Sequence, residues 1–159
     1  MPERRYVFAF DHPHHRSRAD LTDLLGGKGA NLAEMATTLA LPVPPGFTIT
    51  TEACRQFLRH GVPDGLDDEI RAALTELGRV AGKRFGDPSD PLIVSVRSGA
   101  RYSMPGMMDT VLDLGLNDRS VAALAGRTDA RFAYDTYRRF VSGFARFVLG
   151  LPADPFAGD

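Results

Sequence analysis

Small residues and a cation combine in one segment in a way that suits the binding of a negatively charged group. The segment Gly26-Gly27-Lys28-Gly29 directly precedes a stretch with helical periodicity. Glycines let backbone amides approach an anion closely, and a helix N-terminus adds amide donors and a favourable dipole. A lysine supplies a mobile positive charge for phosphate oxygens. The spacing of a P-loop is absent, and such turns are common without any ligand, so a simple turn is the alternative interpretation.

An arginine at the end of an apolar run is a second candidate. Residues 92–96 form a nearly continuous apolar run, which predicts a strand buried on both faces, and Arg97 follows at its C-terminal end. Open α/β sheets bind ligands at that end of their strands. Pairing with a nearby carboxylate is the other interpretation of Arg97, and Arg101, further along the loop, has no assigned role.

A pair of arginines in the last predicted helix is a third candidate. Arg138 and Arg139 lie on opposite flanks of the apolar stripe of this helix, near the rim of the core. Solvation of the guanidinium groups is the default for such positions. Ligand binding gains support if the helix lies near Lys28 and Arg97.

Two further groups of residues each have a functional interpretation and a purely structural one. His12, His14 and His15 could suggest a metal site, but Pro13 and the lack of Cys or acidic partners favour a solvated loop. The methionines of the long loop that follows Arg97 suit a movable lid or gap-filling core packing, and core packing is the commoner case. These methionines are Met104, Met107 and Met108.

The composition is that of one globular domain. The chain has 159 residues, 43% of them apolar and 25% charged, with a formal net charge of −1. This balance disfavours an arginine-rich helix that contacts RNA. The single cysteine, Cys54, cannot form an internal disulfide and is expected in the core. Without a long apolar run or a signal peptide, the sequence predicts a soluble, cytoplasmic protein.

Periodicity and turn chemistry predict an α/β fold with a small mixed sheet and flanking helices. A short strand ends before Asp11, and a helix after the glycine turn has Leu32, Met35, Ala36 and Leu39 on one face. Further strands are predicted over 47–50, 92–96 and 110–114, and further helices over 51–58, 67–84, 119–125 and 130–149.

Several long motifs carry a resemblance to a known family. They are Leu24–Met35, Pro42–Thr51, Ser95–Arg101, Ser103–Leu112 and Arg131–Phe140. In this order they resemble the opening of the pyruvate, phosphate dikinases over nearly the whole stretch from Leu24 to Phe140. The related phosphoenolpyruvate synthases share the Gly-Gly-Lys turn and the Val-Arg-Ser strand end but lack the Ser-Met-Pro-Gly-Met-Met-Asp-Thr loop.

The resemblance implies an activity and a set of ligand contacts. The family converts ATP, phosphate and pyruvate to AMP, pyrophosphate and phosphoenolpyruvate through a phosphorylated histidine. By motif, Lys28, Arg97 and Arg139 would contact the phosphates of ATP, and the turn Gly26, Gly27 and Gly29 would offer its backbone. The phosphohistidine and the acidic ligands of Mg²⁺ are expected outside this chain, so no catalytic or metal-binding residue is assigned within it.

The resemblance also implies an organisation. Residues 1–20 would form an N-terminal strand and a loop atypical of the family, and residues 21–159 the front half of an ATP-grasp-like nucleotide-binding domain. The leading hypothesis is a phosphotransferase portion that is inactive without the remaining dikinase domains, supplied in trans or in a full-length dikinase. The alternative is a non-catalytic module that binds nucleotide or docks onto such an enzyme.

Overall fold

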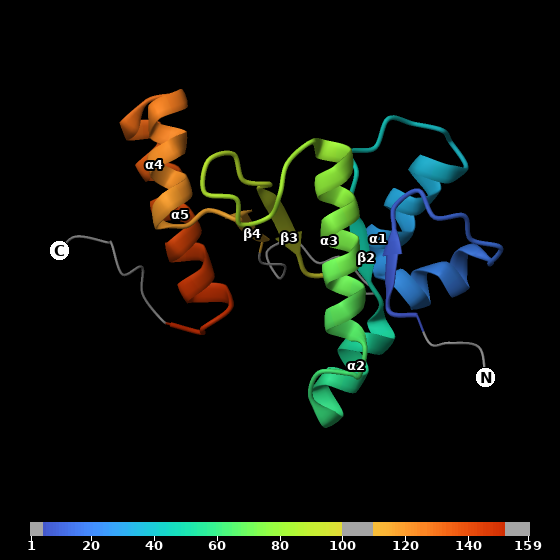
Figure 1. Ribbon diagram of the computed structural model, residues 1–159. Coiled ribbons are helices and arrows are strands. Elements are labelled where there is room, and N and C mark those ends of the chain that lie inside the picture. Colours follow the sequence, from blue (N-terminus) through green and yellow to red (C-terminus); the bar gives the residue numbers. More distant parts are fainter. Residues whose placement is uncertain (1–4, 100–109, 152–159) are drawn as a thin grey trace. The chain divides into compact units, whose positions relative to one another are not determined.

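The computed structural model describes residues 5–99 and 110–151 (Figure 1). In chain order the elements are β1 (Val7–Ala9), α1 (Arg18–Thr37), β2 (Phe47–Ile49), α2 (Thr51–His60), α3 (Leu66–Ala81), β3 (Val94–Arg97), β4 (Thr110–Leu114), α4 (Asp118–Arg127) and α5 (Ala130–Phe147). The described residues form two compact units, 5–77 with Gly99, and 78–98 with 110–151. None of the helices in these ranges has the length and apolar character needed to cross a membrane.

The predicted α/β class is confirmed, but the single mixed sheet is wrong. The described strands form two separate two-stranded sheets, and both pairs are antiparallel. In the first unit Val7 of β1 lies opposite Ile49 of β2, and Ala9 lies opposite Phe47. Two strands bury little surface by themselves, so each sheet depends on helices packed against it.

A carboxylate from α3 completes the hydrogen bonding at the start of β1. Glu69 Oε2 accepts hydrogen bonds from the backbone N–H groups of Tyr6 and Val7, each at 2.8 Å. The Tyr6 carbonyl accepts from the Thr50 amide at 2.8 Å, and the Tyr6 hydroxyl donates to Gln56 Oε1 at 2.9 Å. Helix α3, helix α2 and the N-cap of α2 therefore satisfy the polar groups at the start of one short strand.

The core of the first unit has two apolar clusters. One contains Tyr6, Val7, Ala53 and Leu66, and the other contains Leu21, Leu25, Ala30 and Ala33. The predicted inner face of α1 is therefore wrong, because Met35 and Leu39 are exposed. Small residues form the inner face of α1 instead, and they let the helix approach β2 closely: a Cβ on Gly29 would lie 2.8 Å from Cγ2 of Thr48.

Helix α2 begins where the sequence predicts. Thr50 is its N-cap, with its hydroxyl accepting from the Ala53 amide at 3.3 Å, and Thr50 itself is 1% exposed. The core position of this helix is Ala53 and not Cys54, which is exposed. The sequence prediction for Cys54 is thus wrong, because the apolar face of α2 is narrower than its composition suggests.

In the second unit, β3 and β4 pair with Arg97 opposite Thr110, and α5 packs against both β4 and α4. The bounds of β4 match the prediction, and α4 and α5 lie within a few residues of it. The predicted double burial of β3 is wrong, because Val96 is 49% exposed. The buried residues of this unit are Gly78, Pro91, Leu92, Val111, Gly115, Leu116, Ser120, Val121, Ala133 and Ala145.

One carboxylate organises the turn between α3 and β3. Asp87 Oδ1 accepts from the Ser89 hydroxyl at 2.7 Å, the Ser89 amide at 2.8 Å and the Asp90 amide at 3.1 Å. These hydrogen bonds lower the pKa of Asp87 to about 2. Such local side-chain to backbone bonds are the reason why Asp and Ser favour turns over helices.

Candidate functional site

The glycine turn lies inside α1 as a break between two helical segments. Gly26 has φ 72° and ψ 167°, a backbone conformation that is essentially restricted to glycine. The chain is helical on both sides of it, from Arg18 and up to Thr37. The predicted turn is therefore present, although the helical segment before it was not predicted. The break places Lys28 in the first turn of the second segment.

Lys28 is held by a tightly packed backbone. The lysine is half-buried, and the neighbouring Gly29 and Ala30 are buried. Besides Thr48, Cβ of Leu25 lies 3.0 Å from the place of a Cβ on Gly29. Two contacts this short leave no room for a larger residue, so the packing against β2 fixes the position of the Lys28 backbone.

Arg97 ends β3, as the sequence predicts, but in an open environment. The residue is exposed, and it lies opposite Thr110, the first residue of β4. Arg101 and the methionines 104, 107 and 108 lie outside the described residues. The described structure thus gives Arg97 a fixed backbone position in a two-stranded ribbon and leaves its guanidinium accessible.

The two arginines of α5 share one carboxylate. Asp135 Oδ2 accepts from Nε of Arg139 at 2.8 Å, and Asp135 Oδ1 accepts from Nη2 of Arg138 at 3.0 Å. The hydrogen bond from Arg138, with the charges of both arginines, lowers the pKa of Asp135. With its Nε bonded to Asp135, Arg139 keeps its two terminal nitrogens as a forked donor for an anion.

Arg139 borders an open hollow of about 490 Å³ at the start of α5. The residues that line it are Asp129, Arg131, Phe132, Asp135 and Arg139. Asp129 is also the N-cap of α5 and accepts from the Phe132 amide at 2.9 Å. The Tyr137 hydroxyl donates to Asp118 Oδ1 at 2.8 Å, and this hydrogen bond joins α5 to the start of α4.

A second carboxylate near Arg139 was missed at the sequence level. Burial raises the pKa of Asp113 on β4, and the positive charge of Arg139 acts in the opposite direction. Asp113 also has a φ of 59°, a left-handed conformation that is rare outside glycine, asparagine and aspartate. The signal that could have indicated it is an acidic residue two positions before Gly115, at the end of a strand.

The structure brings Arg97 and Arg139 into one unit and Lys28 into the other. Within the second unit, α5 packs on β4, the strand that pairs with Arg97. The convergence of all three cations on one ligand stays a prediction.

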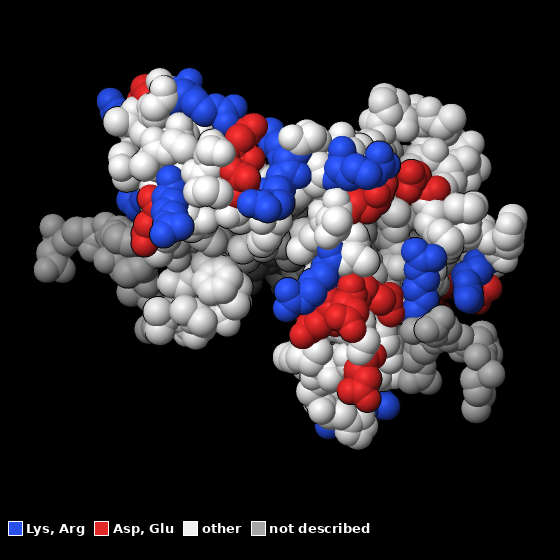
Figure 2. Space-filling model, viewed as in Figure 1, with Lys and Arg blue, Asp and Glu red and all other residues white. Residues whose placement is uncertain are grey.

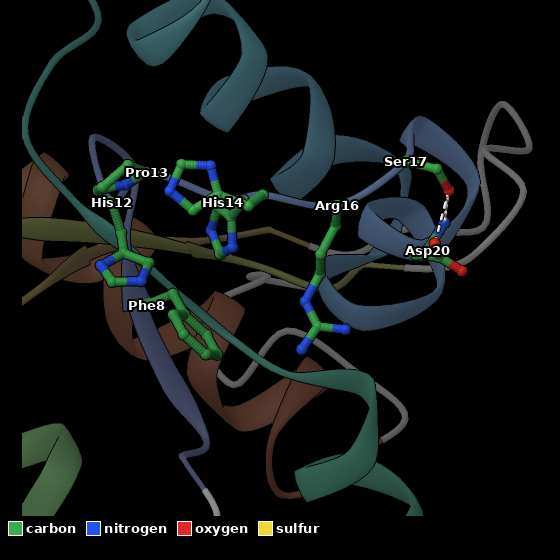
Figure 3. A pocket seen from close by; sticks show the side chains of 8 residues that line it. Phe8, His12, Pro13, His14, Arg16, Ser17 and Asp20 are labelled. Carbon is green, nitrogen blue, oxygen red and sulfur yellow. Dashed lines mark hydrogen bonds between the residues drawn. The ribbon is translucent and has the colours of Figure 1, made fainter.

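The histidine segment borders an open hollow of the first unit, of about 520 Å³ (Figure 3). Phe8, His12, Pro13, His14, His15, Arg16, Ser17 and Asp20 line this histidine hollow. His12 and His14 pack on Phe8, so the expected solvated loop is partly wrong. Among residues 5–99 and 110–151, no three His, Cys, Asp or Glu side chains are grouped so that they could hold a metal ion.

Basic and acidic side chains alternate on the face that Figure 2 shows, without a continuous basic surface. Several of the basic residues are paired locally: Arg127 contacts Asp90 at 2.6 Å, and Lys83 contacts the same carboxylate at 2.9 Å. Arg18 pairs with Glu34 and Asn31.

Known proteins share most of this sequence. A family model described as "Pyruvate phosphate dikinase, AMP/ATP-binding domain" matches residues 22–77, which include the glycine turn and Lys28. The chain is 54% identical over 155 residues to a chloroplastic pyruvate, phosphate dikinase of Flaveria pringlei, covering 96% of this chain and 16% of that protein. It is 50% identical over 155 residues to the pyruvate, phosphate dikinase of Clostridium symbiosum, covering 96% of this chain and 17% of the relative. The chain thus spans about a sixth of the length of these relatives.

Proposed function

Because the chain belongs to the pyruvate, phosphate dikinase family, we propose that it supplies part of the ATP-binding site of such an enzyme. The observation that carries the proposal is the match to an AMP/ATP-binding domain over residues 22–77, where Gly26 breaks α1 just before Lys28. The proposed overall reaction converts ATP, phosphate and pyruvate to AMP, pyrophosphate and phosphoenolpyruvate through a phosphohistidine. On its own this chain is proposed to bind nucleotide without catalysing phosphotransfer.

The proposed ligand contacts are Lys28, Arg97 and Arg139, with the backbone of Gly26, Gly27 and Gly29 beside the phosphates. Phosphoryl transfer requires positioning and charge neutralisation more than covalent chemistry by the protein, and cations aimed at the phosphate chain supply both. The lysine offers a point charge, and Arg139 offers a fork whose plane Asp135 fixes. The chemistry of the three side chains therefore suits a polyphosphate.

The same side chains do not suit a divalent cation, because ammonium and guanidinium groups repel it. Mg²⁺ would enter with ATP, and its acidic ligands are proposed to lie in other parts of the enzyme. The proposal includes an ATP-grasp-like architecture for residues 21–159, with residues 1–20 as a preceding strand and loop. It also includes the remaining dikinase domains as partners, and a cytoplasmic location.

Calorimetric titration of the chain with Mg-ATP tests the proposal. Lys28→Ala, Arg97→Ala and Arg139→Ala should each weaken binding roughly tenfold or more, since each removes a charged hydrogen bond of about 1.5–3 kcal/mol. Arg138→Ala is the matched control: it removes a neighbouring arginine that shares Asp135, and it should leave the affinity nearly unchanged. Equal affinity in all four variants, or no binding by the unmodified chain, would count against the proposal.

A phosphotransfer assay separates the enzyme from the alternative. The chain is mixed with the separately expressed remainder of a relative. Formation of phosphoenolpyruvate from ATP, phosphate and pyruvate is measured, and so is formation of ATP from phosphoenolpyruvate, AMP and pyrophosphate. Activity that depends on Lys28 supports an enzyme portion that works in trans. Nucleotide binding without any activity in the mixture supports the non-catalytic module instead.

A further inference from the structure

The histidine hollow lies between the end of β1 and the start of α1, away from the glycine turn along the chain (Figure 3). Its rings form a compact group. The centroids of His12 and His14 lie 5.1 Å and 5.2 Å from that of Phe8, and the two imidazoles meet edge to face at 4.9 Å. Ring packing of this kind holds the imidazoles in place without hydrogen bonds.

Positive charge surrounds these rings. The guanidinium of Arg5 lies 4.9 Å from the Phe8 centroid, and Arg16 lines the hollow. Burial lowers the pKa of His14, and the charges of His12, Arg16 and Arg5 lower it further. Burial also lowers the pKa of His12, as does Arg5, while Asp11 partly offsets the change. A cation is therefore disfavoured here, and an anion is favoured.

The acidic residues near the hollow compensate this charge only in part. Asp20 Oδ2 accepts from the Ser17 hydroxyl at 2.6 Å, and Ser17 in turn caps α1. In Figure 3 this pair lies at the side of Arg16 opposite to His12 and Phe8. Within the described part of the chain, Arg16 has no ion-pair or hydrogen-bond partner, in contrast to Arg18 two residues later. The Arg16 guanidinium is thus available to a ligand.

One nitrogen in the cluster lacks a partner. Nε2 of His14 is buried and has no hydrogen-bond partner among the described residues. A buried polar atom without a partner costs free energy, so an unmet hydrogen bond calls for an explanation. Because the His14 side chain lines the hollow, a ligand bound there is the partner that we assign to the imidazole.

We infer that the histidine hollow is a binding site for a phosphate group, with Arg16 as the ion-pairing side chain and His14 as a hydrogen-bond donor. This site is distinct from the three cations of the proposed ATP site and does not depend on them. A bound dianion stabilises the charged imidazole, so binding takes up a proton at His14. In the free chain the surroundings lower the pKa of His14, so the expected signature of binding is an upward change in that pKa.

Nuclear magnetic resonance of the imidazole nitrogens, with inorganic phosphate as the probe, tests this site. Saturable shifts of His14 and His12 at millimolar phosphate, with an upward change in the apparent pKa of His14, are the expected result. Arg16→Gln should abolish saturation, and Arg16→Lys, which keeps the charge, should restore part of it. His60→Gln on α2 is the control and should not change the titration.

The source of the phosphate is resolved by repeating the titration with AMP. Tighter saturation of the His14 shift by inorganic phosphate than by AMP indicates a site for inorganic phosphate, and tighter saturation by AMP indicates a phosphomonoester. Unsaturable shifts, or equal titrations in the unmodified chain and Arg16→Gln, would overturn the inference. Lys28→Ala should leave the phosphate titration intact, which distinguishes failure of this site from failure of the ATP site.

Discussion

Lys28 and Arg139 are both proposed to contact phosphate, but the chain positions them in different ways. Lys28 depends on backbone: a glycine-only conformation at Gly26 and a close approach of Gly29 to β2. Arg139 lies on a regular helix, and its guanidinium is oriented by the Asp135 carboxylate. The first arrangement is sensitive to a single methyl group in the packing, whereas the second depends on an exposed ion pair.

The largest expected effect on stability is at Gly29, whose backbone packs closely against β2. Gly29→Ala should lower the free energy of unfolding by about 3 kcal/mol, because a methyl group cannot fit 2.8 Å from Thr48 without strain. Gly126→Ala on α4 is the matched control: no atom lies within 4 Å of its new Cβ, and stability should rise by up to about 1 kcal/mol. Urea unfolding measures both. Equal changes in the two variants would contradict the described packing of α1 on β2.

A double variant sharpens this result. Thr48→Ala removes the two nearest side-chain atoms, so Gly29→Ala should cost less in that background than in the unmodified chain. A cost that does not change would mean that the strain lies elsewhere, for example against Leu25.

Gly26 should give the next largest effect. Gly26→Ala should cost about 2 kcal/mol, since alanine tolerates a φ of 72° with a ψ of 167° poorly. The measurement is again urea unfolding, combined with calorimetric titration of Mg-ATP. Loss of affinity at temperatures where the variant is still folded would connect the break in α1 to ligand binding. Unchanged stability would show that the break in α1 does not need glycine.

The smallest effect on stability is expected at Asp135, which pairs with the Arg139 side chain. Asp135→Asn removes an exposed carboxylate, so the unfolding transition should not change measurably. Mg-ATP affinity should nevertheless fall severalfold, because Arg139 is no longer held in one plane. Asp135→Glu, which keeps the charge, should recover part of the affinity. If Arg138→Ala loses as much affinity as Asp135→Asn, then Arg138, and not Arg139, is the arginine that Asp135 orients toward the ligand.

Local signals in the sequence predicted the elements well where capping or turn chemistry is strong. The start of α2 at Thr51 and the bounds of β4 are examples. These features depend on a few neighbouring residues, so a sequence is enough to predict them.

Burial was predicted less well, because it depends on partners far along the chain. Periodicity predicted that Met35 and Leu39 face the core. A helix that must approach a strand closely buries its small residues instead, and these are Gly29, Ala30 and Ala33. The same limit applies to β3, whose apolar composition suggested a central strand although it has a single neighbour, β4.

Some features of the candidate site followed from the sequence, and others did not. The positions of Lys28 after a glycine turn and of Arg97 at a strand end followed from local pattern. The pairing of Asp135 with Arg139 was missed although its i,i+4 spacing on a predicted helix is a signal that a sequence carries. The proximity of Asp113 to Arg139 did not follow, because a contact between separate elements leaves no spacing in the sequence.

The hydrogen bonds of Glu69 have a consequence for synthesis on the ribosome. The acceptor for the amides of Tyr6 and Val7 lies 63 and 62 residues later in the chain. At about 5–20 residues per second, roughly 3 to 13 seconds pass between translation of the strand and translation of its acceptor. During that interval the backbone N–H groups of Tyr6 and Val7 have no acceptor from α3, so they depend on water or on other parts of the chain for hydrogen bonds. Emergence of α3 from the exit tunnel ends that window.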